Sequence, residues 1–209
     1  MAAVKLTKNE QKKQKDQLKQ FQRYLPTLQL KKQQLQMVIR QIEQEVERLR
    51  TLQRSLVQDL QSWVAVFAEN RSFEDQQRLD KIVVVDKVVK AKGNIAGVAI
   101  PIFKELTFRD IAYDIDSYPL WVDHGVRSLR EIARYDEMIT TLEKQVELLG
   151  RELRVTSQRV KLFEKVKIPE TKENIRKIGI YLGDQQTAAV VRGKIAKKKL
   201  VRGTGEVVA

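Results

Sequence analysis

The sequence predicts a mainly α-helical protein in which two long helices pair as an antiparallel coiled coil, with a small central β-hairpin insert. Two heptad repeats of apolar residues, one in each half of the chain, predict the helices. A stretch rich in Val and Ile between them is typical of strands. Charged residues make up 32% of the chain and aromatic residues only 6%, which suits long solvated helices better than a compact core.

The first long helix is predicted over residues 1–72. Thr7 and Glu10 have the spacing of a capping box, so we expect regular helix to begin there. From Leu18 onward, apolar residues recur at alternating steps of three and four, and Lys32 and Gln53 fill the two slots that lack one. Seam packing is favoured over a partner-binding pocket for the aromatic residue of this set. The candidate seam residues are Leu35, Ile42, Val46, Leu49, Leu56 and Trp63.

Residues 73–118 form the predicted central insert. Within it, KIVVVDKVVKAKGNIAGVAIPIFKELTF indicates a hairpin whose turn is expected at Lys92-Gly93-Asn94. Pro101 cannot donate a backbone hydrogen bond, so its position is expected at a sheet edge or a strand end.

The second long helix is predicted over residues 119–200, kinked near Pro169 and followed by a flexible tail at 201–209. Its heptad pattern matches that of the first helix, which favours an antiparallel pair. The alternative, in which each seam serves a different partner chain, stays open. The candidate seam residues are Ile132, Ile139, Leu142, Val146, Leu149, Leu153 and Val160.

The register follows from the constant sum of facing residue numbers in an antiparallel pair. A sum of 195 aligns the two seams and also puts Pro26 and Pro169 at one level, which would confine both prolines to a single joint. A slip of one heptad fits the apolar pattern nearly as well. Beyond the joint the apolar phase shifts by one residue, so a loosened turn is expected there, with a straight helix as the alternative.

The formal charge of +13 predicts an acidic partner, and both ends of the chain are basic. No aromatic residues interleave the C-terminal basic run, which disfavours nucleic acid as that partner. With one histidine and no cysteine, His/Cys metal clusters and Cys-His dyads are excluded, and no catalytic site or cofactor is expected. No apolar run is long enough for direct membrane insertion.

Three stretches carry a family resemblance. SQRVKLFEKVKIPETKENIRKIGIYL contains an Arg-Val pair, a Glu, an Ile-Pro pair and a spaced run of Ile and Leu. NIAGVAIP at residues 94–101 and the N-terminal LTKNEQKKQKDQLKQFQRYLPTLQLKKQQL add to it. Together they resemble the D subunit of the V-type (A/V-type) rotary ATPases and ATP synthases. After Leu182 this chain departs from the family pattern, so family contacts there are not carried over.

The resemblance implies a central-stalk shaft that transmits torque between a catalytic ring and a membrane rotor. The implied partners are the catalytic and nucleotide-binding ring subunits A and B, the small F subunit of the stalk and the C or d subunit that caps the rotor. The chain itself would be non-catalytic, cytoplasmic and peripheral to the membrane. A prefoldin-like chaperone or another coiled-coil scaffold is the alternative. Candidate ring contacts are Arg159, Glu164, Ile175, Ile178, Leu182, Arg192, Lys194, Lys197 and Lys198.

Overall fold

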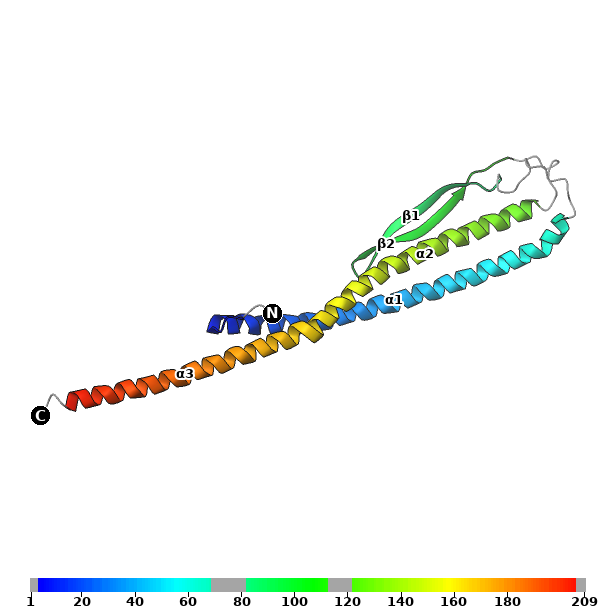
Figure 1. The fold of residues 1–209 in the computed structure, drawn as a ribbon. Coiled ribbons are helices and arrows are strands. Elements are labelled where there is room, and N and C mark those ends of the chain that lie inside the picture. Colours follow the sequence, from blue (N-terminus) through cyan, green and yellow to red (C-terminus); the bar gives the residue numbers. More distant parts are fainter. Residues whose placement is uncertain (1–3, 69–81, 113–121, 206–209) are drawn as a thin grey trace. The chain divides into compact units, whose positions relative to one another are not determined.

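The computed structural model describes residues 4–68, 82–112 and 122–205, with side chains described to residue 62 in the first range and to residue 199 in the last. It is mainly helical, with two long helices packed together and a two-stranded antiparallel hairpin, which confirms the predicted fold class (Figure 1). The chain divides into two compact units. One comprises residues 31–155, and the other comprises residues 1–30 together with 156–209.

The first helix, α1, spans Lys8–Ala68. The Thr7 hydroxyl oxygen accepts a hydrogen bond from the backbone N–H of Glu10 at 3.3 Å, as the capping box predicts. The Glu10 carboxylate does not complete the box, because it accepts from the side chain of Gln14 at 2.9 Å instead. Residues 69–72 of the predicted helix lie outside the described part of the chain.

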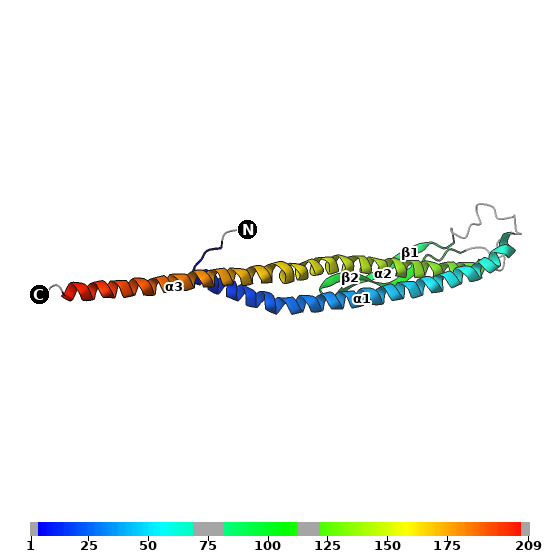
Figure 2. The ribbon, with the colours of Figure 1, turned by 60° about the horizontal axis from the view of Figure 1, so that its bottom comes forward.

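In the unit of residues 31–155, α1 lies beside α2, which spans Val122–Leu162 (Figure 2). Val46 and Leu49 of α1 form a buried cluster with Ile139 of α2, and Tyr135 and Leu142 pack against it. Burying such side chains stabilises the pair by roughly 1.5–3 kcal/mol each. The two heptad seams therefore pair within this chain.

Two ion pairs between the helices fix the register. Lys31 Nζ lies 2.6 Å from Glu152 Oε1, and Arg50 Nη2 lies 2.6 Å from Glu143 Oε1. Their residue numbers sum to 183 and 193, which bracket 188 symmetrically. The expected sum of 195 is therefore wrong by one heptad.

The charges beside the seam explain the slip. A sum of 195 would move the partner of each ion pair by seven residues, so that Arg50 would lie beside Gly150 in place of Glu143, and Lys31 beside the like-charged Arg159 in place of Glu152. The apolar pattern repeats every heptad and cannot distinguish the two registers, whereas oppositely charged pairs at the flanking positions can. The register one heptad lower satisfies both lysine and arginine.

The hairpin consists of β1 (Val85–Ile95) and β2 (Val98–Phe108). Ala96 and Gly97 form its turn, with φ values of 51° and 82°, and the Gly97 N–H donates to the Asn94 side chain at 2.9 Å. Positive φ at two central residues is the geometry that tight hairpins prefer. The turn expected at residues 92–94 is therefore wrong, since these residues belong to β1.

Gly93 lies inside the strand for a packing reason. A Cβ added there would come within 2.5 Å of the Ile102 side chain on the neighbouring strand. The missing side chain makes room for Ile102, so this glycine marks a close approach and not a turn.

The hairpin docks on the coiled coil through both apolar and polar buried contacts. Ile100 joins a cluster with Leu35 and Leu149, both fully buried. The Gln145 side chain, 6% exposed, donates to the Pro101 carbonyl oxygen at 2.6 Å. In a two-stranded sheet both strands are edges, so Pro101 occupies an edge strand as expected.

In the other unit, the end of α2 leads through the π-helical turn η4 (Phe163–Lys167) into α3 (Ile168–Gly205). The ring of Phe21 in α1 stacks on Phe163 with centroids 5.3 Å apart. α3 continues to Gly205, five residues into the segment for which a flexible tail is expected, and residues 206–209 lie outside the described part of the chain. A glycine costs a helix about 1 kcal/mol, which does not suffice to end it.

Leu149→Ala should destabilise the unit of residues 31–155 by about 2–5 kcal/mol, because it removes a fully buried side chain from between Leu35 and Ile100 and leaves a cavity. Urea unfolding followed by circular dichroism measures this change. Leu52→Ala on the exposed side of α1 is the matched control, and its effect should stay within about 0.5 kcal/mol. Equal losses in the two variants would contradict the assigned core.

Candidate functional surfaces

The turn η4 is where the helix accommodates Pro169. The backbone N–H of Ile168 donates to the carbonyl oxygen of Phe163, five residues earlier, so this turn holds one residue more than an α-helical turn. In a regular α-helix the ring of Pro169 would clash with the carbonyl of Lys165. The wider turn relieves that clash directly before the proline.

The extra residue also accounts for the shift in apolar phase. Thr156 and Val160 are buried before η4, and Phe163 is half-buried. Continuing the same three-four spacing from Phe163 would bring residues 170 and 177 into the interface, but Thr171 and Ile178 are the buried residues. The one-residue shift expected from the sequence therefore takes place in η4.

Pro26 and Pro169 do not lie at one level, which corrects the expected joint. Phe21 lies beside Phe163, so Pro26 is level with residues before η4, and Pro169 is level with residues before Phe21. Pro26 is exposed within the unbroken helix α1. Each proline is accommodated separately, because η4 resolves the clash of Pro169 without a matching break in α1.

The last part of α3 extends beyond the start of α1 (Figures 1 and 2). The two helices are adjacent at Gly179, where an added Cβ would lie 3.4 Å from the Gln11 side chain. From Gly183 to Lys199 every residue except the half-buried Ala188 is exposed. We call residues 183–205 the α3 extension.

The α3 extension combines exposed apolar and basic side chains. Val190, Val191 and Ile195 are 59%, 50% and 52% exposed. The same segment holds six basic residues and one acidic residue. Apolar side chains left open to water on a strongly basic helix are typical of a surface that a partner covers.

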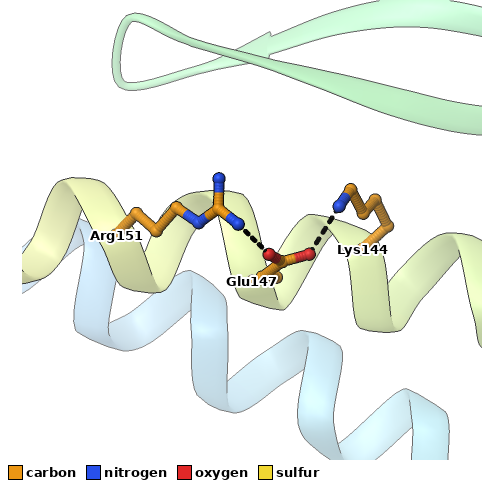
Figure 3. A network of polar contacts seen from close by, with 3 residues as sticks. All are labelled: Lys144, Glu147 and Arg151. Atoms are coloured by element: carbon orange, nitrogen blue, oxygen red, sulfur yellow. Dashed lines mark hydrogen bonds and ion pairs between the residues drawn. The ribbon is translucent and has the colours of Figure 1, made fainter.

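The exposed face of α2 carries a different kind of polar contact. Glu147 accepts hydrogen bonds from Lys144, at 2.6 Å, and from Arg151 (Figure 3). The hydrogen bond from Lys144 and the charge of Arg151 lower the pKa of the Glu147 carboxyl below its usual value. Glu173 and Arg176 form a similar pair on α3. Such pairs one turn apart support an exposed helix and offer no catalytic geometry.

Within the described ranges, no cluster of His, Cys, Asp or Glu residues is arranged to hold a metal ion. None of the described helices combines the length and apolarity needed to cross a bilayer.

Comparison with known proteins identifies the family. A family model for the D subunit of ATP synthase matches residues 10–198. The chain belongs to the ATP synthase D-subunit family. A V-type ATP synthase D subunit from Borreliella burgdorferi is 52% identical over 202 residues, which cover 97% of each chain. Proteins of the same name from Chlamydia abortus and Chlamydia pneumoniae are 37% and 34% identical, covering 94% of this chain and 93% of theirs. The prefoldin-like alternative receives no support from these relatives.

The seam residues named from the sequence are buried or half-buried in this D subunit, except that the side chain of Trp63 lies outside the described residues. The candidate ring contacts differ in exposure. Ile175 and Leu182 are half-buried. The exposed candidates are Arg159, Glu164, Arg192, Lys194, Lys197 and Lys198. Ile178 is fully buried, so it packs inside the coiled coil and is no longer a candidate for partner contact.

Sequence reasoning missed a row of buried polar residues on α2. Thr141 is 1% exposed and Gln145 is 6% exposed, and the hairpin covers Gln145, which donates to the Pro101 carbonyl oxygen. The available signal was the absence of charge at these two positions, which flank the seam where a coiled coil usually carries Glu or Lys. This uncharged row predicts a second buried face.

Deleting Lys165 together with Pro169→Ala should leave the stability of this D subunit nearly unchanged or raise it. The deletion removes the extra residue of η4, the substitution removes the clash, and a continuous α-helix can then form. Thermal unfolding measured by circular dichroism tests this.

Deleting the exposed Thr140, in the middle of α2, is the control for that experiment. It turns the seams on its two sides by about 100° relative to each other and should lower the melting temperature strongly. If deletion of Lys165 also lowered the melting temperature strongly, η4 would not contain a surplus residue, and the prediction would be contradicted.

Proposed function

We propose that this chain is the central-stalk shaft of a rotary V-type ATP synthase or ATPase, and that it transmits torque between the catalytic ring and the membrane rotor. Its membership of the D-subunit family supports this role. The unpaired α3 extension is the observation that carries the mechanism, because it presents exposed apolar and basic side chains with no partner in the described part of the chain. The chain itself performs no catalysis in this scheme.

The α3 extension would enter the bore of the ring formed by subunits A and B. It spans residues 183–205, which corresponds to about 35 Å of helix. Val191 and Ile195 lie one turn apart and can pack against apolar ring residues, while the basic side chains can meet acidic loops. The chain would also contact the small F subunit of the stalk and the subunit that caps the rotor, in a complex peripheral to the membrane.

Coupling requires that the shaft present different faces to the catalytic sites around it. A helix with apolar side chains on some faces and lysines on others interacts unequally with identical subunits, so each orientation favours a different set of ring conformations. Rotation then converts ATP turnover into torque, or the reverse. The packed seam of residues 31–155 supplies the stiffness needed to carry that torque.

Val191→Ser with Ile195→Ser should weaken binding of this chain to the assembled ring by about tenfold or more, because two apolar contacts are lost. The measurement is affinity for the ring of subunits A and B, together with ATP-driven ion transport in vesicles containing the complete complex. Met37→Ser with Val57→Ser is the matched control, since both side chains are exposed in the other unit.

A chain ending at Leu182 provides the second arm of the test. It should bind the ring weakly and fail to support ion transport. Ring binding equal to that of the full chain would contradict insertion through α3. If unfolded proteins were recovered bound to this chain in place of the ring subunits, the rotary function as a whole would be contradicted.

A further inference from the structure

One face of α2 carries an arginine groove. Arg127, Arg130 and Arg134 follow one another at steps of three and four, so their side chains project from the same side of the helix. With Glu131, Tyr135 and Met138 they line an open hollow of about 560 Å³. The groove lies within the unit of residues 31–155 and is separate from the α3 extension.

An aromatic ring from the hairpin holds two of these arginines in place. The guanidinium carbons of Arg130 and Arg134 lie 5.5 Å and 5.9 Å from the ring centroid of Phe108. Contacts of this kind are worth roughly 0.5–1 kcal/mol at exposed sites. They restrict the two side chains before any ligand arrives, which lowers the entropy lost on binding.

The arginines of the groove have unused hydrogen-bond donors. Among the described residues, the buried Nε of Arg130 has no hydrogen-bond partner, and neither Arg127 nor Arg134 has a carboxylate partner. Arg130 Nη2 is 3.7 Å from Asp110, whose side chain is 98% exposed. Arg50 and Arg151, elsewhere in the same unit, bond directly to glutamates. A buried donor without a partner is costly unless a ligand satisfies it.

The charge of the groove favours carboxylates. Glu131 lies among the three arginines and accepts a hydrogen bond from the Tyr135 hydroxyl at 3.2 Å. Burial and the Glu131 charge raise the pKa of Tyr135 above its usual value. A net charge of about two positive units balances one or two carboxylates.

We propose that the arginine groove binds an acidic helical segment of a protein partner, with carboxylates spaced one turn apart. The groove runs from Arg127 to Met138, which corresponds to about 16 Å of α2 and matches two to three turns of a partner helix. Arginine forks bind carboxylates through paired hydrogen bonds, which gives the contact its geometry. The proposal rests on Phe108 and on residues 127–138, and not on the rotary function.

The test uses the full chain and a fluorescent synthetic helical peptide with glutamates at one-turn intervals, with binding followed by anisotropy. The variant Arg127→Gln, Arg130→Gln, Arg134→Gln should bind this peptide about tenfold or more weakly. The control Arg40→Gln, Arg54→Gln, Arg154→Gln removes the same charge from exposed positions of the same unit and should change binding less than about twofold. Circular dichroism verifies that both variants fold.

Two further variants separate geometry from charge. Lysine at all three groove positions keeps the charge but loses the fork, so binding should be intermediate. Phe108→Leu should weaken binding by roughly threefold, because the guanidiniums lose the ring that orders them.

Several outcomes would overturn the proposal. Equal losses in the groove and control variants would mean attraction by net charge alone. Equal binding of the peptide with glutamine in place of glutamate would mean that the carboxylates do not matter. Displacement of the peptide by millimolar inorganic phosphate or by a DNA duplex, with higher affinity for either at the same arginines, would assign the groove to phosphate. None of these outcomes bears on ring binding by α3, so failure here is distinguishable from failure of the rotary function.

Discussion

Pairing of α1 with α2 across the apolar seam of residues 31–155 is the interaction on which the other features depend. A two-stranded hairpin has too little core to persist alone, and it is held where Leu35 and Leu149 meet beneath Ile100. The ion pairs of Lys31 and Arg50 set which heptads face each other. That register decides where the hairpin docks, and therefore which face of α2 Phe108 can reach.

The long helices, their pairing and the one-residue change of phase were predictable, because each depends on the spacing of apolar residues along the chain. The register was not, since a heptad pattern is unchanged by a slip of one repeat and only the charges beside the seam break the degeneracy. The turn was misplaced because glycine serves two purposes: Gly97 provides a positive φ, whereas Gly93 makes room for Ile102. Pro169 predicted a disturbance, but its form as a π-helical turn depends on packing around both flanking segments.

The two candidate surfaces also differ in whether the sequence alone could predict them. The α3 extension could be found from the sequence, because its basic and apolar residues are neighbours along one segment. The arginine groove could not, because it needs Phe108 on a strand and Arg130 on a helix to come together in space. Gln145 was missed for a related reason: its burial is caused by the Pro101 carbonyl of a distant strand. Local composition therefore indicates a partner surface more readily than it indicates a preorganised one.

The π-helical turn resembles a dislocation in a crystal, in that it is one surplus unit whose position can move while the lattice on either side stays intact. Such a defect travels along a helix when each N–H in turn exchanges an acceptor five residues back for one four residues back. If the wide turn moved past Pro169, the ring of Pro169 would clash with the carbonyl of Lys165, so the defect stays on the N-terminal side of the proline. The proline thus holds the defect at one boundary and keeps Thr171 and Ile178, and the described side chains of α3 beyond them, in a single rotational setting.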